Sequence, residues 1–166
     1  MNQPIRMIRT VLIAMAAVCC FTGVAAAQGA QKIDAWTLLT KAQIQVAVGQ
    51  NVGDGKPNAN ANPAVGTSCQ YVIGDYGSFS ILVKAAGPGE TAVKMMAELT
   101  KMKIAVSEAP GIGDRSFFSS PGYGMLQLNT FKSSKYLIIT MLVPGATEAA
   151  QKVAAEKLMR EALTKI

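Results

Sequence analysis

The sequence predicts an α+β domain, in which an antiparallel β-sheet of about five to six strands carries about three packed helices. Three observations lead to this prediction. Phe79, Ile81 and Val83 fall on alternate positions, the period-two pattern of a strand with one buried face. Residues 136–143 are almost all apolar, which is typical of a central strand covered on both faces. Across residues 147–164, apolar residues recur at helical spacing opposite a charged face.

Residues 1–27 are typical of a secretory signal peptide. Two arginines precede an apolar stretch at residues 11–24, which is shorter than the roughly 20 residues that a membrane span needs. Three alanines ending at Ala27 complete a cleavage pattern, so we expect cleavage before Gln28 and a periplasmic or secreted protein. Two alternatives stay open: an uncleaved anchor, and a lipid on one of the two cysteines in this segment, although neither cysteine follows the small residue usual in lipoprotein signals.

Cleavage would leave one domain, residues 28–166. Removing 27 of the 166 residues leaves 139, and the loss of two arginines lowers the net charge from +6 to +4. Cys69 is then the only cysteine, so an internal disulfide is excluded and the stability must come from a packed core. The chain has no histidine, which excludes His-based triads, imidazole metal ligands and histidine proton shuttles.

The first helix of the domain has a readable start and end. Thr40 and Gln43 have the spacing of a capping box, in which each side chain bonds the backbone N–H of the other residue. Gly49 is placed to end this helix. Residues 50–67 are expected to form a long polar loop, and loops of that length are usually functional or disordered.

The remaining elements follow from alternating patterns, helical patterns and turn residues. Strands are expected at residues 69–73, 78–86, 104–107, 115–119, 125–131 and 136–143. Helices are expected at residues 90–101 and 147–164. The solvent face of the last helix alternates Glu148, Lys152, Glu156 and Arg160, so it is a self-paired surface and not a basic surface for nucleic acid.

Two segments of the chain align at a fixed offset of 56 residues. Residues 78–91 match residues 134–147, and the Pro88-Gly89 pair matches Pro144-Gly145. Each half has the order strand, turn, strand, Pro-Gly and helix. Two copies are too few for a solenoid, so the repeat favours a pseudo-symmetric α+β domain.

No group of residues forms a recognisable catalytic site, so we expect a protein that is not an enzyme and that has no cofactor or metal. Gly111-Ile112-Gly113-Asp114 lacks the third glycine and the helix start of a dinucleotide loop, and it is interpreted as a turn with Asp114 bonding amides. Two alternatives stay open. One is a hydrolase using serine and lysine near Lys132-Ser133-Ser134-Lys135, and the other is copper handling through methionine thioethers.

The order of motifs resembles a broad group of small exported bacterial α+β domains of unknown function, many of which are lipoproteins. Cys69-Gln70-Tyr71 and Gly111-Ile112-Gly113-Asp114 carry this resemblance, which covers residues 36–166. It implies an α+β fold and a location outside the cytoplasm, and it carries over no catalytic residues. The chain departs from the group because it lacks a convincing lipoprotein motif.

We therefore expect an exported binding or accessory module of the cell envelope, whose partner is an envelope protein or a small ligand. Aromatic side chains near turns are the expected contact residues, because tyrosine offers a large apolar face with a polar tip. The candidate binding residues are Tyr76, Phe117, Phe118, Tyr123 and Asp114.

Overall fold

The computed structural model describes residues 33–59, 62 and 64–166. The predicted signal peptide, its cleavage point and residues 28–32 lie outside the described residues. After a 3₁₀ turn at Ala35–Thr37, the elements are α1 (Lys41–Val48), β1 (Lys56–Ala59), β2 (Thr67–Ile73), β3 (Gly77–Ala85), α2 (Ala92–Lys101), β4 (Ala105–Glu108), β5 (Arg115–Gly122), β6 (Met125–Lys132), β7 (Lys135–Leu142) and α3 (Glu148–Leu163).

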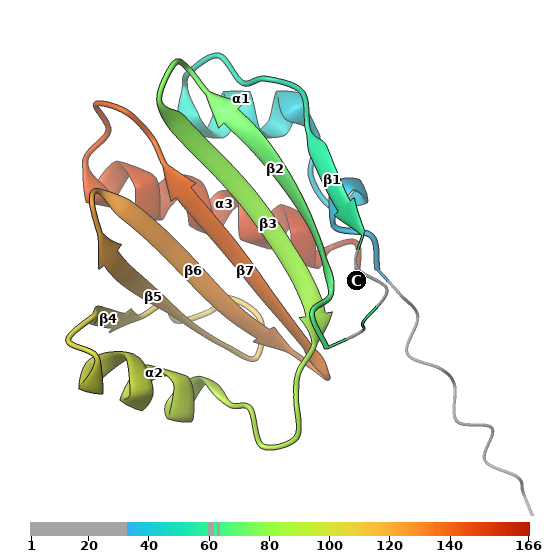
Figure 1. The fold of residues 1–166 in the computed structure, drawn as a ribbon, viewed down its shortest axis with the longest axis vertical. Helices are drawn as coiled ribbons and strands as arrows, with labels where there is room; N and C mark the ends of the chain where they lie inside the picture. Colours follow the sequence, from blue (N-terminus) through green and yellow to red (C-terminus); the bar gives the residue numbers. More distant parts are fainter. Residues whose placement is uncertain (1–32, 60–61, 63) are drawn as a thin grey trace, which may run out of the picture.

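The strands form one antiparallel sheet in the order β1-β2-β3-β7-β6-β5-β4 (Figure 1). This arrangement confirms the α+β class and the antiparallel sheet. β7 lies at the centre between β3 and β6, as its apolar sequence predicts.

The seventh strand is β1, which lies inside the segment that the sequence predicts as a loop. Its four residues pair with β2, yet all four side chains are exposed, so no alternation of apolar residues marks the strand. It contains Pro57, which is tolerated because this strand forms an edge of the sheet. Backbone pairing with β2, which only the folded chain provides, creates this strand.

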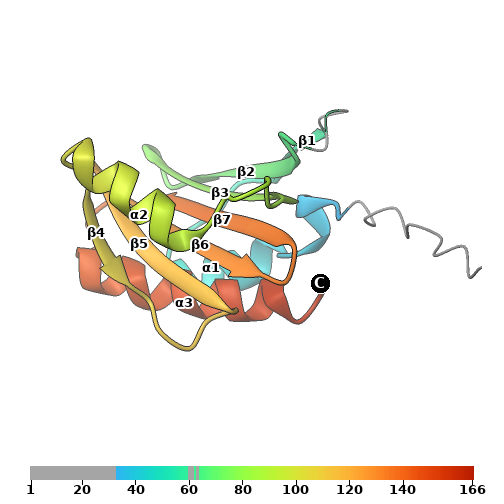
Figure 2. The same cartoon turned by 90° about the horizontal axis from the view of Figure 1, so that it is seen from below.

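α1 and α3 cover one face of the sheet, and α2 lies across part of the other face (Figure 2). The larger core lies between the sheet and the α1–α3 pair. It contains inward side chains from the strands, including Phe79, Ile81, Leu137 and Ile139, and the α3 residues Leu158 and Met159 complete it.

A smaller core lies under α2. Phe117, Phe131 and Tyr136 come from three neighbouring strands, and the helix covers them with Ala92 and three partly buried apolar side chains, Met95, Met96 and Leu99. The rings of Phe131 and Tyr136 stack at a centroid distance of 4.5 Å. Both faces of the β5–β6–β7 half of the sheet are therefore buried.

The expected repeat holds for the strands and not for the helices. β3 and β7 lie side by side at the centre, each with its hairpin partner on the outer side. The two following helices, however, lie on opposite faces of the sheet, α2 on one and α3 on the other (Figure 2). The pseudo-symmetric arrangement is thus confined to β2–β3 and β6–β7.

The local signals at α1 are confirmed. The Thr40 hydroxyl accepts the Gln43 N–H, and the Gln43 side-chain oxygen accepts the Thr40 N–H at 2.9 Å. Gly49 ends the helix in the left-handed conformation with φ +68°.

Within residues 33–59, 62 and 64–166, no helix is both long enough and apolar enough to cross a membrane.

Candidate functional site

Three connections converge at one end of the sheet, and we call this region the hairpin-turn edge. It consists of the β2–β3 turn at residues 74–76, the β5–β6 turn at residues 123–124, and residues 143–146 between β7 and α3. Because neighbouring strands run antiparallel, the ends of β2, β7 and β5 meet the starts of β3 and β6 at the same edge (Figure 1). The tertiary structure thus brings together turns that lie far apart in the sequence.

Two tyrosines stand at the tips of these turns. The side chain of Tyr76 is 85% exposed and that of Tyr123 is 99% exposed, so neither contributes to a core. The turns are separated by three strand spacings of about 4.8 Å each, or about 14 Å along the edge. Two tyrosines at this separation are close enough to contact the same partner surface. Tyrosine is enriched among the interface residues that contribute most of the binding free energy.

Tyr123 is held in an unfavourable backbone conformation. It forms a two-residue turn with Gly124, and both have positive φ, +55° and +75°, as a type I′ turn requires. Asparagine or glycine is preferred at the position of Tyr123, because a bulky side chain is strained at positive φ. Residues held in such sparsely populated backbone conformations cluster at functional sites.

The segments around these tips are anchored to the body of the domain. The Gln50 side chain donates to the Pro144 carbonyl at 2.7 Å. The Gln151 side chain donates to the Gly124 carbonyl at 3.2 Å and accepts the Val143 N–H at 3.3 Å. The edge therefore presents its two tyrosines from a fixed frame, which lowers the entropy lost when a partner binds.

The prediction that Phe117 and Phe118 present exposed rings for binding is wrong. Both are buried, with Phe117 under α2 in the smaller core and Phe118 in the larger core, where the Lys152 ammonium lies 5.3 Å from its ring centroid. Successive residues of a strand point to opposite faces, and both faces of β5 are covered at this point. The double coverage of β5 explains why adjacent aromatic residues are both internal.

Asp114 lies in the predicted turn, between Gly113 and β5, at the opposite end of the sheet from the two tyrosines. Its carboxylate accepts the Ser133 N–H and pairs with Lys132 at 3.1 Å, so it holds the tip of the β6–β7 hairpin. The hydrogen bond from the Ser133 amide, supported by Lys132, lowers the pKa of the Asp114 carboxyl. The structure therefore places Asp114 in a structural contact, away from the hairpin-turn edge.

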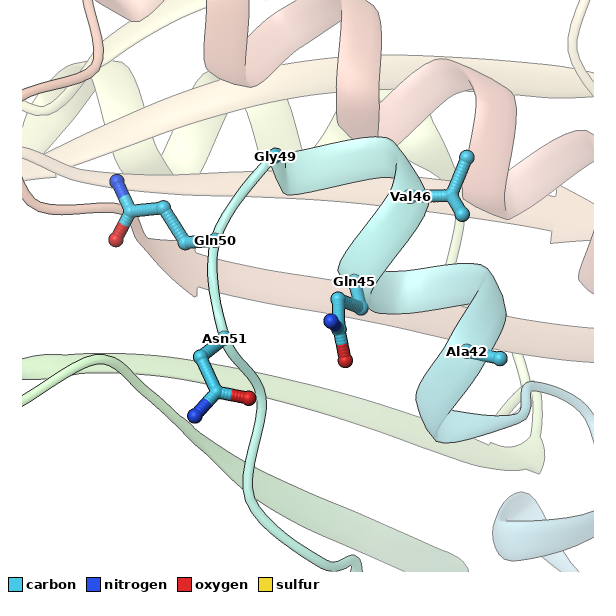
Figure 3. Close-up of a pocket in the computed structure, with 6 residues that line it drawn as sticks. All are labelled: Ala42, Gln45, Val46, Gly49, Gln50 and Asn51. Atoms are coloured by element: carbon cyan, nitrogen blue, oxygen red, sulfur yellow. The ribbon is translucent and has the colours of Figure 1, made fainter.

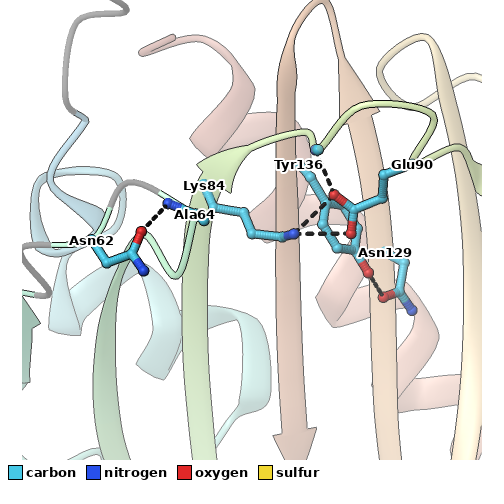
Figure 4. Close-up of polar contacts among 7 residues, drawn as sticks. Asn62, Ala64, Lys84, Glu90, Asn129 and Tyr136 are labelled. Atoms are coloured by element: carbon cyan, nitrogen blue, oxygen red, sulfur yellow. Dashed lines mark hydrogen bonds and ion pairs between the residues drawn. The ribbon is translucent and has the colours of Figure 1, made fainter.

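A second polar cluster lies beside α2, where sequence reasoning expected nothing. The Lys84 ammonium binds both carboxylate oxygens of Glu90, at 2.8 and 2.9 Å, and it lies 5.3 Å from the Tyr136 ring centroid (Figure 4). The Tyr136 hydroxyl donates to Asn129 at 2.6 Å. Each side chain has a partner, so the cluster fastens the segment before α2 to the sheet.

The electrostatics of this cluster follow from its burial and its charges. Burial alone raises the pKa of the Glu90 carboxyl, but hydrogen bonds from Lys84 and the Gly87 amide outweigh it, so the pKa lies below its ordinary value. Burial, with a smaller contribution from the Glu90 charge, raises the pKa of the Tyr136 hydroxyl. Glu90 therefore stays ionised and Tyr136 stays neutral near neutral pH.

The lowered pKa of Glu90 predicts a stability loss in acid. A depressed native pKa contributes stability above the unfolded-state value of about 4.5, and this contribution is lost as the pH falls through the native pKa. We expect Glu90→Gln to be less stable than the wild type near pH 7, with a difference that shrinks below about pH 4. Urea unfolding across this pH range measures it.

The exposed variant Glu98→Gln is the control for this measurement, because Glu98 pairs with Lys101 on the solvent side of α2. Its effect on the free energy of unfolding is expected to stay within about 0.5 kcal/mol at every pH. A Glu90→Gln difference that is constant from neutral to acid pH would contradict the role assigned to the carboxylate.

The residues named for the two alternative functions lie at a hairpin tip and in the two cores. Lys132, Ser133, Ser134 and Lys135 sit together at the tip of the β6–β7 hairpin. Asp114 pairs there with Lys132 at 3.1 Å and accepts the Ser133 N–H. The methionine thioethers are divided between opposite faces of the sheet, with Met141 and Met159 buried in the larger core and the partly buried Met95 and Met96 against the smaller one. Cys69 is buried in the larger core.

Comparison with known proteins adds no functional assignment. No protein-family model matches the chain, and no curated protein matches it. A crystal structure described as a GTP binding regulator from Thermotoga maritima is similar over 77% of this chain and 93% of its own, at 13% sequence identity and a TM-score of 0.36. A similarity at that score supports no inference about relationship or ligand.

Proposed function

We propose that this protein is an exported, non-enzymatic binding module of the cell envelope and that it binds its partner through the hairpin-turn edge. Export rests on the signal-peptide pattern of residues 1–27. The observation that carries the binding role is Tyr123, whose ring is 99% exposed on a turn that favours a different residue. Tyr76 on the neighbouring turn supplies a second anchor.

Binding of this kind requires a rigid frame and exposed contact residues. The frame is provided by the hydrogen bonds of Gln50 and Gln151 to the edge segments. Neither tyrosine is committed to a hydrogen bond or ring contact among the described residues, so both exposed rings are available to a partner. A tyrosine ring that becomes buried at an interface often contributes a large share of the binding free energy, which makes tyrosine a typical hot-spot residue.

The test is retention by envelopes prepared from the source organism. The mature wild-type protein is expected to co-sediment with them, and the double variant Tyr76→Ser, Tyr123→Asn is expected to bind at least about tenfold more weakly. Tyr123→Asn alone is expected to keep or raise the free energy of unfolding, because Asn-Gly suits a type I′ turn. A loss of binding by the single variant Tyr123→Asn therefore cannot be ascribed to unfolding.

Val93→Ser is the matched control, because Val93 is also exposed and apolar but lies on α2, away from the edge. It is expected to bind envelopes like the wild type. Wild-type protein that fails to co-sediment, or a double variant that is retained equally well, would refute the proposed function.

A further inference from the structure

A cavity of about 520 Å³ that is largely open to solvent lies beside α1 at the hairpin-turn edge (Figure 3). It is lined by Ala42, Gln45, Val46, Gly49, Gln50 and Asn51. This volume falls within the range of about 300–1,000 Å³ that is usual for small-molecule sites. The cavity is thus large enough for one monomer unit of a longer ligand.

The lining carries amides and no charged side chain. Gln45, Gln50 and Asn51 each offer an N–H donor and a carbonyl acceptor. Gln50 is oriented by its bond to the Pro144 carbonyl, whereas the side chains of Gln45 and Asn51 make no hydrogen bond among the described residues. Val46, which is 72% exposed, adds an apolar contact. These groups suit a neutral ligand with several hydroxyl or amide groups.

The charges around the cavity also favour a neutral ligand. Lys41 precedes the lining residue Ala42, but its ammonium is paired with Asp54 at 2.8 Å. Asp75, in the adjoining β2–β3 turn, is exposed, and its carboxylate accepts hydrogen bonds from hydroxyl groups and repels anions.

The cavity adjoins the turn that carries Tyr76. The Gly74 N–H donates to the Asn51 carbonyl at 2.9 Å, so this turn starts at the rim of the cavity. A ligand that extends from the cavity along the edge reaches the turn that carries the exposed Tyr76. Tyrosine has an apolar face and a polar tip, which fits a ring with an apolar face and hydroxyl groups at its rim.

We propose that the hairpin-turn edge binds an uncharged carbohydrate chain, with one sugar unit in the cavity between α1 and Asn51 and the next unit against Tyr76. This inference rests on the proposed function and names the class of its ligand. The side-chain amides of Gln45 and Asn51 exchange hydrogen bonds with sugar hydroxyls, and the Tyr76 ring packs on the apolar face of the adjoining unit.

The test is nuclear magnetic resonance of the ¹⁵N-labelled mature protein, titrated with short maltose-type, cellobiose-type and chitin-type oligosaccharides. At least one series is expected to shift the side-chain amide signals of Gln45 and Asn51 in a saturable manner. Gln45→Ala and Asn51→Ala are each expected to weaken that binding by about tenfold. Gln70→Ala, which removes an exposed amide from β2, is the control and is expected to leave the affinity unchanged.

Three results would overturn the inference: no saturable shift with any of these sugars, equal affinity in Asn51→Ala, or a response only to an anionic sugar such as a heparin fragment. Envelope retention is scored separately with the Tyr76 and Tyr123 variants. Retention that depends on the tyrosines, without any response to sugars, would refute the carbohydrate ligand and leave the binding module standing.

Discussion

Replacing Phe79 with alanine is expected to lower the free energy of unfolding by about 3–5 kcal/mol. The ring lies in β3 and is completely buried, stands opposite Met141 of β7, and packs edge-on against Tyr71 at a centroid distance of 5.9 Å. Its removal costs the transfer free energy of the ring and leaves a cavity that the packed strands cannot close. Urea unfolding followed by circular dichroism measures the change.

Tyr76→Ala provides the matched control, because it removes a ring of similar size from the turn just before β3. That ring is 85% exposed, so the change in the free energy of unfolding is expected to stay within about 0.5 kcal/mol. Similar losses in the two variants, or a loss below about 1 kcal/mol for Phe79→Ala, would contradict the described core.

Gly77→Ala is expected to destabilise the protein by about 3 kcal/mol, the upper end of the range for overpacking. A Cβ atom at Gly77 would lie 2.5 Å from the Pro144 ring and 2.7 Å from the carbonyl oxygens of Ile73 and Leu142. Two of these three atoms belong to the paired backbones of β2 and β7, so relief requires the strands to separate. Thermal and urea unfolding measure the effect.

Gly53→Ala is the control for this substitution. A Cβ atom there meets nothing closer than 3.7 Å, although Gly53 also contacts β2 through a hydrogen bond to Val72. We expect its stability to be unchanged or raised by up to about 1 kcal/mol, because alanine restricts the unfolded chain. Equal behaviour of the two variants would show that the contact between Gly77 and Pro144 is looser than described.

The close approach at Gly77 also bears on the proposed site. Gly77 packs closely against Pro144 in the segment that follows β7, and the Gln50 side chain donates to the carbonyl of the same Pro144. The position of Tyr76 relative to the cavity therefore depends on two contacts between segments that are distant in sequence. A bulkier residue at position 77 is expected to impair binding as well as folding.

Features that arise from local interactions could be predicted from the residue pattern alone. The capping box of Thr40 and Gln43 joins residues three positions apart, and alternation along β3 assigns Phe79, Ile81 and Val83 to one buried face. From such patterns the α+β class, six of the seven strands and all three α-helices could be predicted. Tyr76 and Tyr123 could be identified as turn residues for the same reason.

Properties that depend on which segments become neighbours could not be predicted before the fold was known. β1 has no apolar face and is held by backbone bonds to β2, and Phe117 is buried because α2 crosses β5 on the face that the α1–α3 pair leaves uncovered. The pairing of β3 with β7 places the turns of Tyr76 and Tyr123 on one edge. The periodicity of apolar residues predicts whether a side chain is buried or exposed. It does not predict which distant segment covers that side chain, because this contact forms only when the strands assemble into the sheet.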